Sequence, residues 1–118
     1  MRRTKTKGIM VFRHDEIAPI LQQIKSLTIR PTQGGVIRKG SLYEAKIEPW
    51  STYTFGILEI ENVIVKKLKE ITSADVSKDG YLSLKLLRQR WERTYGRWNP
   101  EQLVRFISFR LVSHTEGA

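Results

Sequence analysis

The sequence contains no cysteine and no apolar run long enough to cross a membrane. The first absence excludes disulfides, thiolate nucleophiles and cysteine-ligated zinc sites. The second follows from the roughly 18 apolar residues that a transmembrane helix needs. The apolar stretch IMVF, residues 9–12, follows a basic N-terminus but is too short for the core of a secretory signal. We therefore expect a cytoplasmic protein with no membrane partner.

Motifs that define common catalytic sites are also missing. There is no glycine-rich phosphate loop, no G-x-S-x-G and no HExxH. The two histidines, His14 and His114, lie far apart and have no companions at metal-ligand spacing. Polar residues at the start of a helix explain His14-x-Glu16 better than a metal site does. We expect neither a metal nor a cofactor.

Basic residues, by contrast, are in excess. The 118 residues include 21 Lys and Arg against 12 Asp and Glu, which gives a formal net charge of +9. Such an excess favours partners that carry phosphates or other anions, although many basic proteins are merely soluble. The length suits one domain, and a hydrophobic content of 40% is enough for one modest core. A nucleic acid or nucleotide is one candidate partner, and a solvated scaffold domain is the alternative.

The pattern of apolar residues predicts a single domain over residues 8–112, between a basic mobile arm (1–7) and a tail (113–118). Strands are predicted at 8–13, 27–30, 41–49, 55–68 and 103–112. Helices are predicted at 14–25, within 71–80, where Thr72 or Ser73 is the cap, and at 84–96, where Ser83 is the cap. Because strands neither alternate regularly with helices nor form only hairpins, the fold class is α+β.

The apolar phase of the fourth predicted strand slips near Asn62, which indicates a bulge or a sharp bend. Such bends are common where a sheet curls into a barrel. We therefore expect a curled mixed sheet or open barrel with helices covering one opening.

Two features are candidates for nucleic-acid contact, and each has a plain structural explanation. The helix predicted at 84–96 buries a stripe formed by Leu84, Leu87, Trp91 and Tyr95. Another face of this region carries Arg90, Arg93 and Arg97. These arginines either contact phosphates or form a solvated helix surface. Trp50 lies in a predicted turn, where it either stacks on a base or covers one end of the sheet.

The stretch IKSLTIR, residues 24–30, is the place where polar residues can be joined into a mechanism. In a strand, Ser26, Thr28 and Arg30 share one side. A lysine such as Lys25, partly removed from water and close to Arg30, can act as a neutral base or nucleophile, and Thr28 can supply an attacking or positioning hydroxyl. Arg30 suits a carboxylate or a phosphate. An ordinary solvated strand explains the same spacing.

Four stretches in order resemble the ASCH domain, a family with a PUA-like barrel. They are Lys-x-x-Thr-x-Arg at 25–30, KGSLYEAK at 39–46, ITSADVSKDGYLSL at 71–84 and WERTYGRWNPEQLVRFISFRLV at 91–112. Together with the short strand and helix before them, they extend the resemblance over residues 8–112. The resemblance implies a PUA-like curled mixed β-barrel, with a cleft whose floor is the Ser26, Thr28 and Arg30 face and whose edge is Lys25.

The resemblance also implies a function. PUA-like domains generally bind RNA or modified nucleotides, so an RNA- or nucleotide-binding domain with a basic cleft is the first expectation. Some small ASCH proteins are amidohydrolases that deacetylate N4-acetylcytidine with a lysine, a threonine and a glutamate. Lys25 and Thr28 match the first two, and Asp79 stands in the place of the glutamate. The alternative expectation is therefore an amidohydrolase for an acylated nucleoside, and a protein-interaction scaffold is the third.

Overall fold

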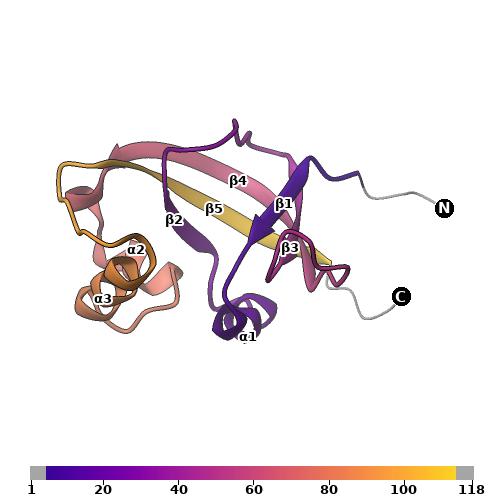
Figure 1. Ribbon diagram of the computed structural model, residues 1–118, viewed down its shortest axis with the longest axis horizontal. Coiled ribbons are helices and arrows are strands. Elements are labelled where there is room, and N and C mark those ends of the chain that lie inside the picture. Colours follow the sequence, from indigo (N-terminus) through magenta and orange to yellow (C-terminus); the bar gives the residue numbers. More distant parts are fainter. Residues whose placement is uncertain (1–4, 114–118) are drawn as a thin grey trace.

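The computed structural model describes residues 5–113 of the chain. Residues 1–4 of the predicted arm and 114–118 of the predicted tail lie outside this range. The elements follow the predicted order, with two added 3-10 turns (Figure 1). They are β1 (Gly8–Val11), η1 (His14–Glu16), α1 (Ile17–Leu21), β2 (Leu27–Pro31), β3 (Leu42–Lys46), β4 (Gly56–Lys67), η2 (Leu68–Glu70), α2 (Ser73–Lys78), α3 (Leu84–Tyr95) and β5 (Leu103–Ser113).

The five strands form one mixed sheet in the order β1-β3-β4-β5-β2. β1 and β3 are parallel, and the other three pairs are antiparallel. The expected α+β class and mixed sheet are confirmed, but the sheet does not close into a β-barrel, because β1 and β2 are its two edges and do not pair with each other. The Arg30 side chain reaches across this gap instead, and its Nη2 donates to the Val11 carbonyl oxygen at 2.7 Å. A side chain therefore bridges the two edges where a barrel would have a backbone ladder.

The bulge expected near Asn62 is confirmed by a register shift between Ile60 and Asn62 in the pairing of β4 with β5. A second shift lies between Ile57 and Leu58. Such irregularities bend the strand and increase its twist. Its partner strand β5 contributes to two separate apolar clusters, with Val104 and Phe106 in one and Ile107 and Phe109 in the other.

The two clusters lie on opposite faces of the sheet. One face buries Leu27 and Ile29 of β2 against α2 and α3, mainly through Val76, Leu87 and Trp91. The other buries residues from β1, β3, β4, β5 and α1 around Phe55, Phe109 and Ile20. Because side chains alternate across β2, Thr28 and Arg30 turn away from the α2–α3 face. No helix within residues 5–113 is long and apolar enough to span a membrane.

Two predictions for the helices need correction. The helix expected over 14–25 ends at Leu21, because Gln23 has a positive φ of 61° and the chain turns sharply toward β2. Backbone N–H groups of both Ile24 and Lys25 donate to the Pro19 carbonyl in this turn. In α3, Leu87 and Trp91 are buried as expected, whereas the other two residues of the predicted stripe, Leu84 and Tyr95, are exposed.

Candidate functional site

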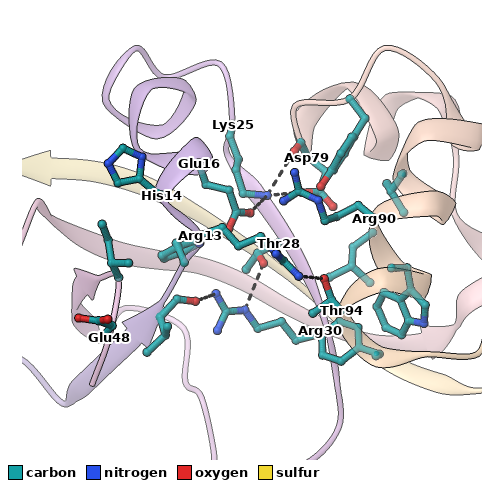
Figure 2. A pocket seen from close by; sticks show the side chains of 18 residues that line it. Arg13, His14, Glu16, Lys25, Thr28, Arg30, Glu48, Asp79, Arg90 and Thr94 are labelled. Atoms are coloured by element: carbon teal, nitrogen blue, oxygen red, sulfur yellow. Dashed lines mark hydrogen bonds and ion pairs between the residues drawn. The ribbon is translucent and has the colours of Figure 1, made fainter. Parts of the chain in front are cut away.

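A cavity of about 560 Å³ opens where β1, η1, β2 and α3 meet the end of α2 (Figure 2). The buried polar residues of the described chain are Lys25, Thr28 and Asp79, and all three line this cavity. Aromatic rings form much of the remaining wall, from Phe12, Tyr81, Trp91 and Tyr95. The cavity therefore combines an apolar, aromatic wall with a small number of buried polar groups, as ligand sites commonly do.

Lys25 and Asp79 form a buried ion pair, with 3% and 7% of their surfaces exposed. The Lys25 ammonium donates to the Asp79 carboxylate. It also donates to the backbone carbonyls of Leu27 at 2.9 Å and of Asp79 at 3.2 Å. Glu16 adds a second carboxylate, with its Oε2 at 3.5 Å from Lys25 Nζ. A buried ammonium is thus matched by two carboxylates and two carbonyls, which offsets its loss of water.

Local structure at the end of α2 places Asp79 opposite Lys25. Asp79 is the C-cap of α2, and Gly80 follows in the left-handed region with a φ of 91°. A Cβ on Gly80 would lie 3.6 Å from the Cβ of Lys25, so the turn packs closely on the lysine. The Ser26 N–H donates to the Lys78 carbonyl at 2.8 Å. This bond joins the end of α2 to the start of β2.

Burial raises the pKa of the Asp79 carboxyl from 3.8 to about 6, although Lys25 beside it acts in the opposite direction. A carboxyl with a pKa near 6 can accept and return a proton close to neutral pH. The pKa of Asp79 therefore lies closer to neutral pH than that of an exposed aspartate.

Thr28 and Arg30 form the second polar group of the cavity. The Arg30 Nε donates to Thr28 Oγ1 at 3.2 Å, and the guanidinium lies 4.8 Å from the centre of the Phe12 ring. Burial lowers the pKa of Arg30, although an arginine still keeps its charge. Since the Thr28 side chain is 6% exposed and accepts from Arg30, its hydroxyl is held in place at the floor of the cavity.

Ion pairs and hydrogen bonds between η1 and α3 hold the rim of the cavity. Arg90 Nη2 lies 2.6 Å from Asp15 Oδ2, and this bond lowers the pKa of Asp15 and raises that of Arg90. Arg13 donates to the hydroxyl of Thr94 (Figure 2). The charged side chains that line the cavity are four cations and three carboxylates: Arg13, Lys25, Arg30, Arg90, Glu16, Glu48 and Asp79. With His14 neutral, this set has a formal charge of +1, so most of the +9 lies elsewhere.

The structure brings together five of the residues predicted for the site. Lys25, Thr28, Arg30, Asp79 and Arg90 line the cavity. The other four lie outside it: Ser26, Trp50, Arg93 and Arg97. Ser26 precedes β2 and lines a separate hollow together with Glu61 and Arg110. Trp50 is 77% exposed in the β3–β4 connection, and Arg93 and Arg97 are exposed at the end of α3 and just after it.

Sequence reasoning missed several residues of the site. Glu16 looked like an ordinary acidic residue in the first turn of a helix, and no spacing links it to Lys25. Arg13 and Thr94 lie 81 positions apart and meet only in the folded chain. Tyr95 was assigned to the core stripe of α3 but is 47% exposed and lines the cavity. The polar hydroxyl of a tyrosine at the end of an apolar stripe is the one sequence signal that could have suggested this exposed position at the cavity.

No protein-family model matches the chain, and no curated protein matches its sequence. Solved structures do match. An ASCH domain from Lactobacillus crispatus superposes with a TM-score of 0.76 at 16% identity, over 91% of this chain and 80% of that one. The chain has an ASCH-domain fold.

Two further structures support this ASCH-domain fold. A protein of the DUF984 family from Enterococcus faecalis gives a TM-score of 0.74 at 10% identity, over 98% of this chain and 86% of that one. A variant of an ASCH protein from Zymomonas mobilis gives 0.62 at 11% identity, over 87% of this chain and 67% of that one. At these identities the likeness is one of fold. The chemistry of this chain depends on the residues of its own cavity.

Proposed function

We propose that this ASCH-fold domain binds RNA or a nucleotide and takes a nucleobase into its cavity. The observation that carries the proposal is the composition of the cavity wall, which joins four aromatic rings to a buried polar floor. Aromatic side chains stack on bases, and each stacked base is worth about 1–3 kcal/mol. The volume of about 560 Å³ falls in the range of small-molecule sites.

The distribution of charge also supports the proposal. The cavity lining is close to neutral, whereas the whole chain carries +9. A neutral base therefore fits inside, and the phosphates of a nucleotide or strand would lie outside, against the basic surface. Contacts to the 2′-hydroxyl and to unstacked bases would then distinguish RNA from DNA.

Anisotropy of a labelled single-stranded RNA of about ten nucleotides tests this proposal. Tyr95→Ala removes a ring from the cavity, and we expect it to weaken binding by roughly 5- to 150-fold, the equivalent of one lost stacking contact. Tyr53→Ala is the matched control, since Tyr53 is 55% exposed and lies outside the cavity. If Tyr53→Ala weakens binding and Tyr95→Ala does not, the base binds at the β3–β4 connection and the cavity assignment is wrong.

A second candidate function is hydrolysis of N4-acetylcytidine or a related acylated nucleoside. It is favoured by one observation: Lys25, Thr28 and Asp79, the residues that the family resemblance pointed to, are all buried and all line one cavity. In this mechanism, Lys25 acts as the base and takes a proton from the Thr28 hydroxyl or from a water that adds to the amide carbonyl. The proton passes across the Lys25–Asp79 contact, the C–N bond breaks, and Asp79 gives the proton to the leaving amine of cytidine. Addition of water releases acetate directly, whereas attack by Thr28 leaves an acetyl ester on Thr28 that a second water hydrolyses to acetate. Arg30, hydrogen-bonded to Thr28, would stabilise the developing oxyanion.

Incubation with N4-acetylcytidine, followed by chromatography for cytidine, tests the hydrolase. We expect Lys25→Ala to lower the rate by about 10²-fold or more, the usual contribution of an acid–base group. Lys85→Ala removes an exposed lysine of α3 and should leave the rate unchanged. Thr28→Val adds a variant that keeps the ion pair, in case Lys25→Ala impairs folding. Full activity of folded Lys25→Ala would refute its role, and no release by the wild type would leave binding as the function.

A further inference from the structure

The two edge strands of the sheet face each other across a seam that continues beyond the first cavity. β1 is parallel to β3, and three antiparallel pairings then connect β3 to β2, so β1 and β2 run in opposite directions. The C-terminal end of β1 therefore faces the start of β2, at the first cavity. The N-terminal half of β1 faces the end of β2, and a second cavity of about 320 Å³ lies there.

Arg30 lies between the two cavities and lines both. Its guanidinium, labelled in Figure 2, donates across the seam to the Val11 carbonyl. The second cavity is bounded by Lys7 and Met10 on the β1 side, and by Pro31 and the connection after it on the β2 side. The cavities are thus successive parts of one groove, with Arg30 at their junction.

The charge of the second cavity differs from that of the first. Its lining includes three cations, Lys7, Arg30 and Arg105, and no acidic side chain. Arg30 and Arg105 are directly opposite each other in the β2–β5 pairing and so lie on the same face of the sheet. Like charges in this position destabilise a sheet.

Arg105 also differs from another arginine of the same strand. Within residues 5–113, its guanidinium makes no ion pair or hydrogen bond, whereas Arg110 pairs with Glu59 across the β4–β5 ladder. Two facing arginines without a carboxylate between them form an unfavourable arrangement that a bound anion would relieve. Guanidinium groups bind phosphate strongly because their planar forks match its oxygens.

We propose that the second cavity binds a phosphate of an RNA strand between Arg30, Arg105 and Lys7 while a base of that strand occupies the first cavity. This inference rests on the proposed RNA-binding function and specifies its ligand as a strand that follows the β1–β2 seam. Arg30 contacts the phosphate from one side and holds Thr28 on the other, so it connects recognition of the backbone with recognition of the base.

The test is the salt dependence of RNA binding by Arg105→Gln, with the same labelled single-stranded RNA of about ten nucleotides. We expect binding on the order of tenfold weaker than wild type, and a log–log salt slope smaller by about 0.7, the value for one phosphate of a single strand. Arg110→Gln loses the same charge from the same strand but outside both cavities, and its slope should stay at the wild-type value. The melting temperature of Arg105→Gln should equal or exceed that of the wild type, because a like-charge neighbour is gone.

Arg105→Gln and Arg110→Gln with equal affinities and equal slopes would overturn the phosphate site. If Tyr95→Ala still weakened binding in that case, the base cavity would stand and only the phosphate site would fall. An absence of measurable RNA binding by the wild type would overturn both. Binding of a polyglutamate peptide that Arg105→Gln weakens, with RNA binding unchanged, would assign the second cavity to an acidic segment instead.

Discussion

At the scale of single residues, burial of the Lys25–Asp79 ion pair is costly in free energy. Removing two charges from water costs several kcal/mol per ion, and well-packed apolar residues of similar volume often stabilise a protein as well or better. The pair is nevertheless buried, and Lys25 has four separate polar groups around it. We infer that the chemistry of the cavity explains this pair better than its contribution to stability does.

Substitutions of the pair test this inference. Lys25→Met alone leaves the Asp79 carboxylate buried without its cation, and we expect the free energy of unfolding to fall by about 3–5 kcal/mol. Combining Lys25→Met with Asp79→Leu should restore most of the lost free energy of unfolding. Urea unfolding monitored by circular dichroism measures this free energy for each variant. A double variant as unstable as the single one would mean that the ion pair itself stabilises the fold.

The raised pKa of Asp79 predicts a distinct pH dependence of stability. Because its value of about 6 lies above the ordinary 3.8, the folded protein holds this proton more tightly than the unfolded chain does. The resulting stabilisation is fully present below about pH 4 and is lost as the pH rises through 6. Relative to Asp79→Asn, which cannot titrate, the wild type should lose about 2 kcal/mol between pH 4 and pH 7. Urea unfolding of both proteins across this range measures the difference, and a constant difference would contradict the raised pKa.

At the scale of elements, α2 determines where Asp79 lies. The helix has only six residues, so its ends contribute much of its stability. Thr72 accepts from the Asp75 N–H at 3.1 Å, and Asp75 accepts from the Thr72 N–H at 3.0 Å, which completes a capping box. At the other end, Gly80 and the bond from Ser26 to Lys78 attach the helix to β2.

Removal of the α2 cap should therefore be measurable. We expect Thr72→Ala to lower the free energy of unfolding by about 1 kcal/mol, the usual cost of losing an N-cap hydroxyl. Ser77→Ala is the matched control, because Ser77 is an exposed hydroxyl residue in the same helix but not at its cap. Chemical unfolding of the three proteins gives the comparison, and equal losses for both variants would show that the capping box contributes nothing.

At the scale of the whole molecule, the sheet separates two apolar clusters, and its unpaired edges β1 and β2 border a groove. The basic excess of the chain lies mostly outside the first cavity. This arrangement is expected for a domain that recognises a base inside and a charged backbone outside.

Salt dependence separates such a domain from a scaffold that is basic only for solubility. If the chain binds single-stranded RNA, log affinity should fall linearly with log salt concentration, with a slope of about −0.7 for each phosphate neutralised. Anisotropy titrations at a series of salt concentrations provide the slope. If affinity is insensitive to salt, and neither RNA nor a nucleoside raises the melting temperature, the scaffold interpretation is preferred.

Local features of the fold could be predicted from the sequence because they depend on neighbouring residues. The caps at Thr72 and Ser83 and the bulge near Asn62 each follow from residues within one or two turns of structure, and each is confirmed. The end of the first helix was misplaced, because a positive φ at a glutamine has no local signal. The predicted curled mixed β-barrel is confirmed only as a mixed sheet that stays open, because closure depends on whether two strands far apart in the assembled sheet reach each other.

By itself, the sequence determined the α+β class, the order of the elements and the basic character, since composition and periodicity carry this information. Thr28 and Arg30 could be placed on one side of a strand from alternation alone. The contact of Lys25 with Asp79, 54 positions away, and with Glu16 depends on the tertiary fold. The tertiary fold also left β1 and β2 unpaired, with Arg30 across the gap. Such contacts join distant segments, and they form because packing the two apolar clusters fixes where each strand and helix ends.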